Sequence, residues 1–196
     1  DADGGAGADE TVLNMVFAPP AVAAFIVNAG AAQRSMVTRL DVVFDLDVAG
    51  SLAAEDVVLE NLTTGATLPG AEFALSYDAP TRTATFTFPR LLAQSLADGV
   101  YRLTLVADGI RGPGAHALDG NSDGGDGGDY AVEFHRRFGD ADGSARVDDT
   151  DVAVYRPAHL VTAGEPAFDA RFDYDADGGA DFLDLLYFHR NYTARR

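Results

Sequence analysis

The C-terminal third of the chain contains one segment twice, and this repeat limits the possible folds more than any other feature of the sequence. The first copy reads FGDADGSARVDDTDVAVYR from residue 138, and the second reads FDYDADGGADFLDLLYFHR from residue 172. A constant offset of 33 residues superposes their aspartates, for example Asp140 on Asp173 and Asp151 on Asp184. Apolar residues follow each series of aspartates, which indicates one short amphipathic helix per copy. The repeat therefore predicts a small helical unit and places its boundary near residue 137.

The second copy has the spacing of a twelve-residue calcium-binding loop. Calcium takes six to eight oxygen ligands at about 2.3–2.6 Å, and such a loop supplies them from alternate residues. Gly178 falls at position 6, where the backbone turns sharply, and position 7 contributes a main-chain carbonyl. The last ligand lies in the first turn of the following helix. The expected ligands are Asp173, Asp175, Asp177, the carbonyl of Gly179, Asp181 and Asp184.

The first copy has the same spacing with weaker ligands. Its expected ligands are Asp140, Asp142, Ser144, the carbonyl of Arg146, Asp148 and Asp151. Ser144 stands where the second copy has a carboxylate, and Ala145 stands where glycine is preferred. One charge fewer and a stiffer turn should lower the affinity, so we expect this loop to release calcium first. The alternative for both loops is a solvated acidic turn, although close carboxylates repel by about 1 kcal/mol per pair at 4 Å even in water.

A third acidic loop precedes the repeats, between residues 116 and 129. Acidic and amide residues alternate in it, glycines follow, and the candidate ligands are Asp119, Asn121, Asp123 and Asp129. The sequence is compatible with a third calcium ion here and equally with a solvated connection. Aspartates also occur within residues 1–10, but no helix follows them, and we expect that Gly/Ala/Asp-rich segment to be flexible.

Residues 11–137 show the period of two that is typical of strands with one buried face. Leu40, Val42 and Phe44 alternate with polar or exposed positions, and short turn sequences such as Pro69-Gly70 separate the runs. The expected strands are 23–27, 39–46, 57–62, 72–77, 83–88, 101–105 and 130–135. About seven short strands with frequent turns predict a mainly β fold, an immunoglobulin-like antiparallel β-sandwich, followed by the small helical unit of residues 138–196.

The charge of the chain argues against several classes of partner. The net charge is -17, and all basic residues are arginines. Such a field repels nucleic acid and anionic membranes. The chain has no cysteine, which excludes disulfides and thiolate metal sites, and no stretch is long enough to predict a membrane span. We expect a secreted protein of the extracellular space or cell surface, because the chain begins at Asp1 as a processed fragment would.

The two copies resemble type I dockerin repeats, in which a calcium loop precedes one helix, over about residues 138–193. Residues 21–136 resemble, more loosely, a bacterial immunoglobulin-like domain. The dockerin resemblance implies a cohesin partner bound through loop positions 10 and 11. Those positions hold Asp149-Thr150 and Phe182-Leu183, and only Thr150 matches the Ser-Thr pair usual in that family. This departure puts cohesin in doubt, and Phe182 and Leu183 are alternatively expected to pack against the sandwich or another protomer.

Three non-catalytic functions follow from these patterns. The first is a calcium-stabilised attachment module that mediates protein–protein assembly. The second is a protomer of an extracellular filament or surface layer, in which residues 11–17 (TVLNMVF) are donated as a strand to a neighbouring copy. The third is a carbohydrate-binding module, which the absence of tryptophan disfavours. We expect no enzyme, because the four histidines are scattered and no catalytic motif is present.

Overall fold

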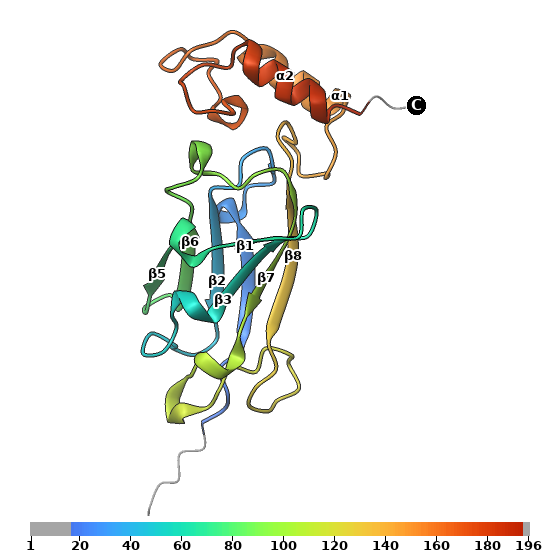
Figure 1. Ribbon diagram of the computed structural model, residues 1–196. Coiled ribbons are helices and arrows are strands. Elements are labelled where there is room, and N and C mark those ends of the chain that lie inside the picture. The colour runs from blue at the N-terminus through green and yellow to red at the C-terminus, as the bar shows by residue number, and fades with distance from the viewer. Residues whose placement is uncertain (1–16, 194–196) are drawn as a thin grey trace, which may run out of the picture.

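The computed structural model describes residues 17–193 and shows a mainly β chain with two antiparallel sheets (Figure 1). One sheet has the strand order β1-β2-β6-β5, and the other has the order β4-β3-β7-β8. The strands are β1 (Val22–Val27), β2 (Arg39–Phe44), β3 (Val57–Asn61), β4 (Ala66–Leu68), β5 (Ala74–Asp78), β6 (Thr83–Thr87), β7 (Gly99–Leu105) and β8 (Tyr130–Arg136). The helices are α1 (Asp149–Tyr155) and α2 (Phe182–Asn191).

The apolar residues of the alternating pattern lie on the core face of the sheets, although on β2 Asp41 of the opposite face is buried as well. Leu40 and Val42 of β2 are fully buried and pair with Phe86 and Ala84 of β6, which are buried as well. On β7 the buried residues include Leu103. Side chains from the inner faces of both sheets form one hydrophobic cluster, so burial of every second residue holds the two sheets together.

Two expected features of the strands need correction. β4 was absent from the expected strands, because a three-residue edge strand with mostly exposed side chains has no readable period of two. The strand expected from Glu72 begins at Ala74 instead, because Gly70–Glu72 forms a short 3₁₀ turn after Pro69. The expectations for residues 1–10, and for all of residues 11–17 except Phe17, lie outside the described residues.

The two repeats exchange equivalent contacts in the C-terminal unit. The Thr193 amide donates to the Val147 carbonyl at 2.8 Å, and the Leu160 amide donates to the Ala180 carbonyl at 2.7 Å. These two pairs are related by the same offset of 33 residues that relates the sequences. Each loop is therefore paired with the segment that follows the other repeat's helix.

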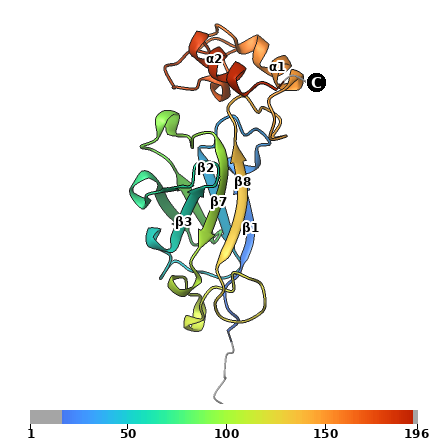
Figure 2. The same ribbon diagram turned by 45° about the vertical axis from the view of Figure 1, so that its right-hand side comes forward.

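A second hydrophobic cluster lies under the two helices. Phe172 and Phe138 are fully buried in it, and Tyr155 stacks on Phe188 with ring centroids 4.5 Å apart. Met36, which belongs to the sandwich in sequence, is also part of this cluster. Figures 1 and 2 show the C-terminal unit at one end of the sandwich, opposite the end where the described chain begins. No helix within residues 17–193 is long and apolar enough to cross a membrane.

Candidate metal centres

The loop of the second repeat, residues 173–184 and hereafter loop 2, gathers its first three aspartates. Carboxylate oxygens of Asp173, Asp175 and Asp177 all lie within 4.8 Å of one another. Asp173 accepts hydrogen bonds from the amides of Asp177 at 3.2 Å and Gly178 at 3.0 Å, so the backbone coils around this carboxylate. The coil requires a left-handed residue at Gly178, with φ of 92°.

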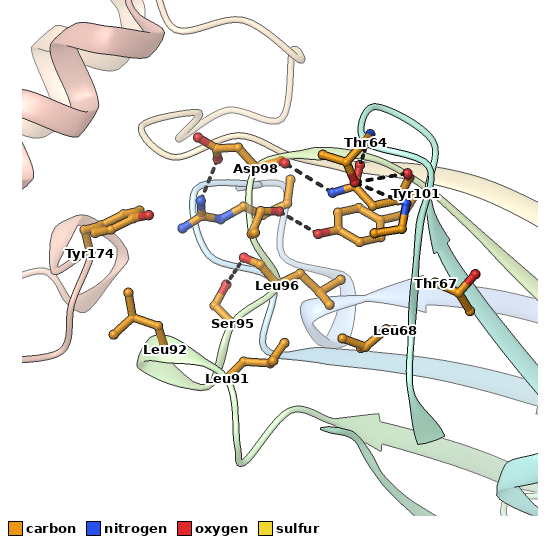
Figure 3. A pocket seen from close by; sticks show the side chains of 14 residues that line it. Thr64, Thr67, Leu68, Leu91, Leu92, Ser95, Leu96, Asp98, Tyr101 and Tyr174 are labelled. Atoms are coloured by element: carbon orange, nitrogen blue, oxygen red, sulfur yellow. Dashed lines mark hydrogen bonds and ion pairs between the residues drawn. The ribbon is translucent and has the colours of Figure 1, made fainter. Parts of the chain in front are cut away.

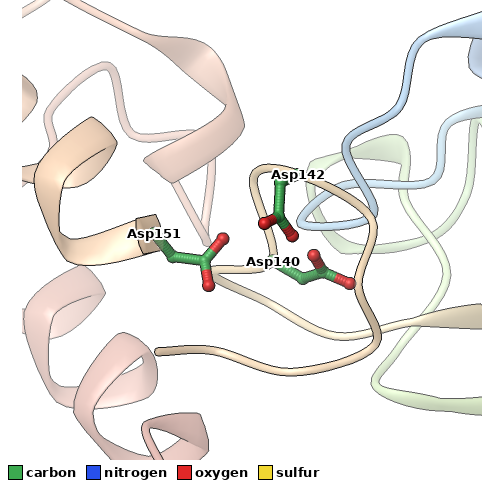
Figure 4. A group of neighbouring side chains, drawn as sticks. All are labelled: Asp140, Asp142 and Asp151. Carbon is green, nitrogen blue, oxygen red and sulfur yellow. The ribbon is translucent and has the colours of Figure 1, made fainter. Parts of the chain in front are cut away.

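The loop of the first repeat, residues 140–151 and hereafter loop 1, also gathers three aspartates, but its third is the aspartate at position 12 and not a residue at position 5. Oxygens of Asp140, Asp142 and Asp151 lie within 4.8 Å of one another, and the three side chains are neighbours (Figure 4). Asp140 accepts from the amides of Ser144 at 3.1 Å and Ala145 at 3.0 Å. Ala145 adopts φ of 65°, so it takes the left-handed conformation expected of glycine at this position, at a cost in strain.

The aspartates at position 12 close both loops from the first turn of the helices. Asp151 and Asp184 are each fully buried. Asp184 accepts from the amides of Tyr174 and Asp181 at 2.6 Å each, and Asp151 accepts from Ala141 and Asp148 at 2.8 Å each. Each carboxylate thus joins the start of its loop to the start of its helix.

The remaining expected ligands differ in their structural roles and in their exposure to solvent. Asp148 and Asp181 are the N-caps of α1 and α2, where they accept from the amides of Thr150 at 2.9 Å and Leu183 at 2.7 Å. Ser144 and Arg146 have exposed side chains, whereas Gly179 is buried. The ligand spacing predicts a metal ligand at position 9 and did not predict that this aspartate also caps the following helix.

Burial of these carboxylates raises several of their pKa values, and repulsion between them adds to the shifts. Burial raises the pKa of Asp184 to about 6, and Asp173 and Asp175 add to this shift by repulsion. Burial also raises the pKa of Asp151 and of Asp173. Asp142 differs, because a hydrogen bond from the Ser144 side chain lowers its pKa. The donors are oxygens alone, and the buried ones are ionised only at a cost, so the residues of both loops fit a hard divalent cation such as calcium.

These shifts predict how the stability of the metal-free chain depends on pH. The pKa of Asp184 is about 6 in the folded chain against a reference value of 3.8, so between these values the folded state binds more protons than the unfolded state. The free energy of unfolding therefore falls as pH rises from about 4 to about 7. Asp184→Asn should lose less stability than the parent over this interval, as measured by urea unfolding of the metal-free proteins. Equal losses in both proteins would show that Asp184 does not carry the effect.

The third acidic loop coils in the same way as the two repeats. Asp119 accepts from the amides of Asp123 at 3.0 Å and Gly124 at 2.8 Å, as Asp173 does from the residues four and five positions later. The Asp123 amide also donates to Asn121 at 3.2 Å. The Asp129 carboxylate takes no hydrogen bond from this coil and instead accepts from the Ala107 amide at 2.9 Å. Three of the four candidate ligands are thus brought together, without an acid at position 12.

A cavity of about 390 Å³ lies between the sandwich and the C-terminal unit (Figure 3). Its lining is mainly apolar and includes Leu68, Leu96 and Tyr174. Arg136 also lines it, is 3% exposed, and donates to Asp98 at 2.5 Å. Among the described residues, the Arg136 Nε atom has no hydrogen-bond partner. Sequence reasoning missed this cavity, since its walls come from segments far apart in the chain.

Comparison with known proteins identifies no relative of this chain. No protein-family model matches the chain. The same holds for the curated proteins and for the solved structures. The geometry of the acidic loops is accordingly the main guide to function.

Proposed function

We propose that this chain is a calcium-stabilised, non-catalytic module of an extracellular protein, in which an immunoglobulin-like sandwich carries dockerin-like repeats that attach to another protein. The observation that carries the proposal is the pair of loops, related by 33 residues, that each gather three aspartates around one point. Evenly distributed surface charge would not require this double clustering.

Calcium supplies the stability that the C-terminal unit lacks alone. Its helices have only seven and ten residues, so they bury little apolar surface, and the clustered carboxylates oppose folding. Extracellular calcium modules have dissociation constants of about 10⁻⁴–10⁻³ M. At a free calcium concentration of about 100 times that constant, one site adds ~2.7 kcal/mol to the free energy of unfolding.

The exposed face of α2 supports the attachment role. Phe182 is 73% exposed, Leu186 is 54% exposed and Leu183 is 40% exposed. Phe182 and Leu183 belong to neither hydrophobic cluster of the chain, which supports packing against another protomer over packing against the sandwich. A large aromatic residue in such a position favours contact with an apolar patch on another protein.

The filament protomer remains the second candidate, supported by the positions of the two ends. The described chain begins at the end of the sandwich opposite the C-terminal unit (Figure 1). A segment that leaves one end and binds a neighbour would produce a head-to-tail chain of copies. The carbohydrate-binding reading is the weakest, because the chain has no tryptophan.

Calcium titration of the full chain tests the proposal. We expect isothermal titration calorimetry to give two bound ions per chain, or three if the Asp119 loop also binds, and Asp119→Ala would separate these cases. Light scattering in calcium and in EGTA then decides between the two candidates. A monomer in both conditions favours the attachment module, and calcium-dependent polymers favour the filament. Absence of any bound calcium at millimolar concentration would refute both.

A further inference from the structure

The two loops differ in what lies next to them, because loop 1 is built against the sandwich. The Asp140 carbonyl accepts from the Arg34 amide at 2.8 Å, and Asp140 Oδ2 lies 2.8 Å from His135 Nε2 at the end of β8. The first ligand of loop 1 is thus held by two residues of the sandwich. Its counterpart Asp173 accepts only from amides of its own loop among the described residues.

Gly143 shows how closely loop 1 approaches the sandwich. It adopts φ of 80°, and a Cβ atom at this position would lie 2.2 Å from the Ala32 carbonyl oxygen. Its counterpart in loop 2 is Ala176, which adopts a similar φ of 58° and is exposed. The backbone conformation alone therefore tolerates alanine, and it is the contact with Ala32 that requires glycine in loop 1.

Two further sandwich residues fasten the chain just before loop 1. The Ser35 hydroxyl accepts from the Gly139 amide at 2.8 Å and donates to the Arg171 carbonyl at 2.6 Å. Asp98 accepts from the Phe138 amide at 2.6 Å and from Asn191 at 2.7 Å. We call the sandwich segments 31–36 and 93–98 the socket. The C-terminal unit sits on the socket through loop 1, the segment that leads into it, and two residues outside the loops, Arg171 and Asn191.

From these contacts we infer that loop 1 is an interdomain calcium site, in which ion binding is coupled to docking of the C-terminal unit on the socket. The first ligand of loop 2 has no such hydrogen bond to the sandwich among the described residues, and Tyr174 of this loop meets the sandwich only through its ring, 5.6 Å from Arg136 Cζ. The inference rests on the proposed calcium function and adds a role for the sandwich in it. Docking orders Asp140 and the following turn before the ion arrives, and coupling between two binding events is reciprocal. Calcium in loop 1 therefore tightens the joint between the two parts of the chain.

Hydrogen exchange of the full chain, with and without calcium, measures this coupling directly. The Arg34 amide donates to Asp140, so its exchange reports on docking from outside the calcium loops. We expect calcium to slow exchange in peptides covering residues 31–36 by about 5- to 150-fold, the usual range for coupled sites. Asp142→Ala should abolish this protection, because Asp142 is an exposed loop 1 ligand whose hydrogen bond to the Ser144 amide stays within the loop. Its counterpart Asp175→Ala is the matched control and should leave the protection intact.

The outcomes separate this inference from the proposed function. The inference is overturned if calcium binds but slows exchange only within the two loops, or if both variants lose socket protection equally. Calorimetry that detects no bound calcium overturns the proposed function instead. Peptides from β2 and α2 report in the same experiment whether each variant is folded, and Asp142→Asn provides a milder change should the alanine variant unfold.

Discussion

Replacing Asp173 and Asp184 together by alanine should abolish the calcium response of loop 2 and remove about half of the stabilisation that calcium provides. At about 100 times the dissociation constant each site adds ~2.7 kcal/mol, which corresponds to roughly 5–10 °C in the midpoint of thermal unfolding for a chain of this size. Asp173 is the centre of the loop coil and Asp184 closes it from α2. Without these two carboxylates the loop retains too few ligands to hold the ion.

The quantity to measure is the difference in unfolding midpoint with and without calcium, for the parent and for the double variant. The absolute stability is less informative, because Asp184 also joins Tyr174 to α2 and its buried charge opposes folding in the absence of metal. Glu55→Ala with Asp108→Ala is the matched control, since it removes two exposed acids outside the loops. The same calcium response in the Asp173/Asp184 variant and in the parent would show that loop 2 is not a site.

Phe172→Ala should destabilise the C-terminal unit by about 3–5 kcal/mol, the usual cost of truncating a buried phenylalanine. Phe172 is fully buried, and its ring lies 5.2 Å from Tyr155 and 6.2 Å from Phe188, measured between ring centroids. Both helices of the unit therefore pack on this one side chain. The unit is small, so a loss of this size should unfold it in the absence of calcium while the separate core of the sandwich remains folded.

Phe182→Ala is the control for that experiment, because it makes the same chemical change at a residue that is 73% exposed. Its effect on the free energy of unfolding should stay within about 0.5 kcal/mol. Circular dichroism near 222 nm during urea unfolding, in EGTA, would follow the helices of both variants. A cost below about 1 kcal/mol for Phe172→Ala would mean that the aromatic cluster does not hold the unit together.

The sandwich strands and the spacing of the loops could be predicted from sequence because both are local patterns. Burial of one face of a strand imposes a period of two. Leu40 and Val42 therefore predict β2 even when the strands that pair with it are not known. Calcium-loop spacing is similarly contained in consecutive residues, and the structure places Asp140, Asp142 and Asp151 together as the spacing predicts. The short edge strand β4 has no such pattern and was missed.

Other parts of the candidate site were decided only by contacts between distant residues. Asp129 has the spacing of a ligand, yet it accepts from Ala107, because the pairing of β7 with β8 brings those residues together. The sequence does not show why loop 1 has Gly143 where loop 2 has Ala176. The reason is the Ala32 carbonyl, which leaves no room for a Cβ atom at Gly143. The longer strands and the ligand series of the repeats could be predicted from the sequence, since side-chain spacing along the chain is sufficient for both. Only the tertiary structure decided that the sandwich holds loop 1, because hydrogen bonds such as that between Arg34 and Asp140 depend on how the two parts pack.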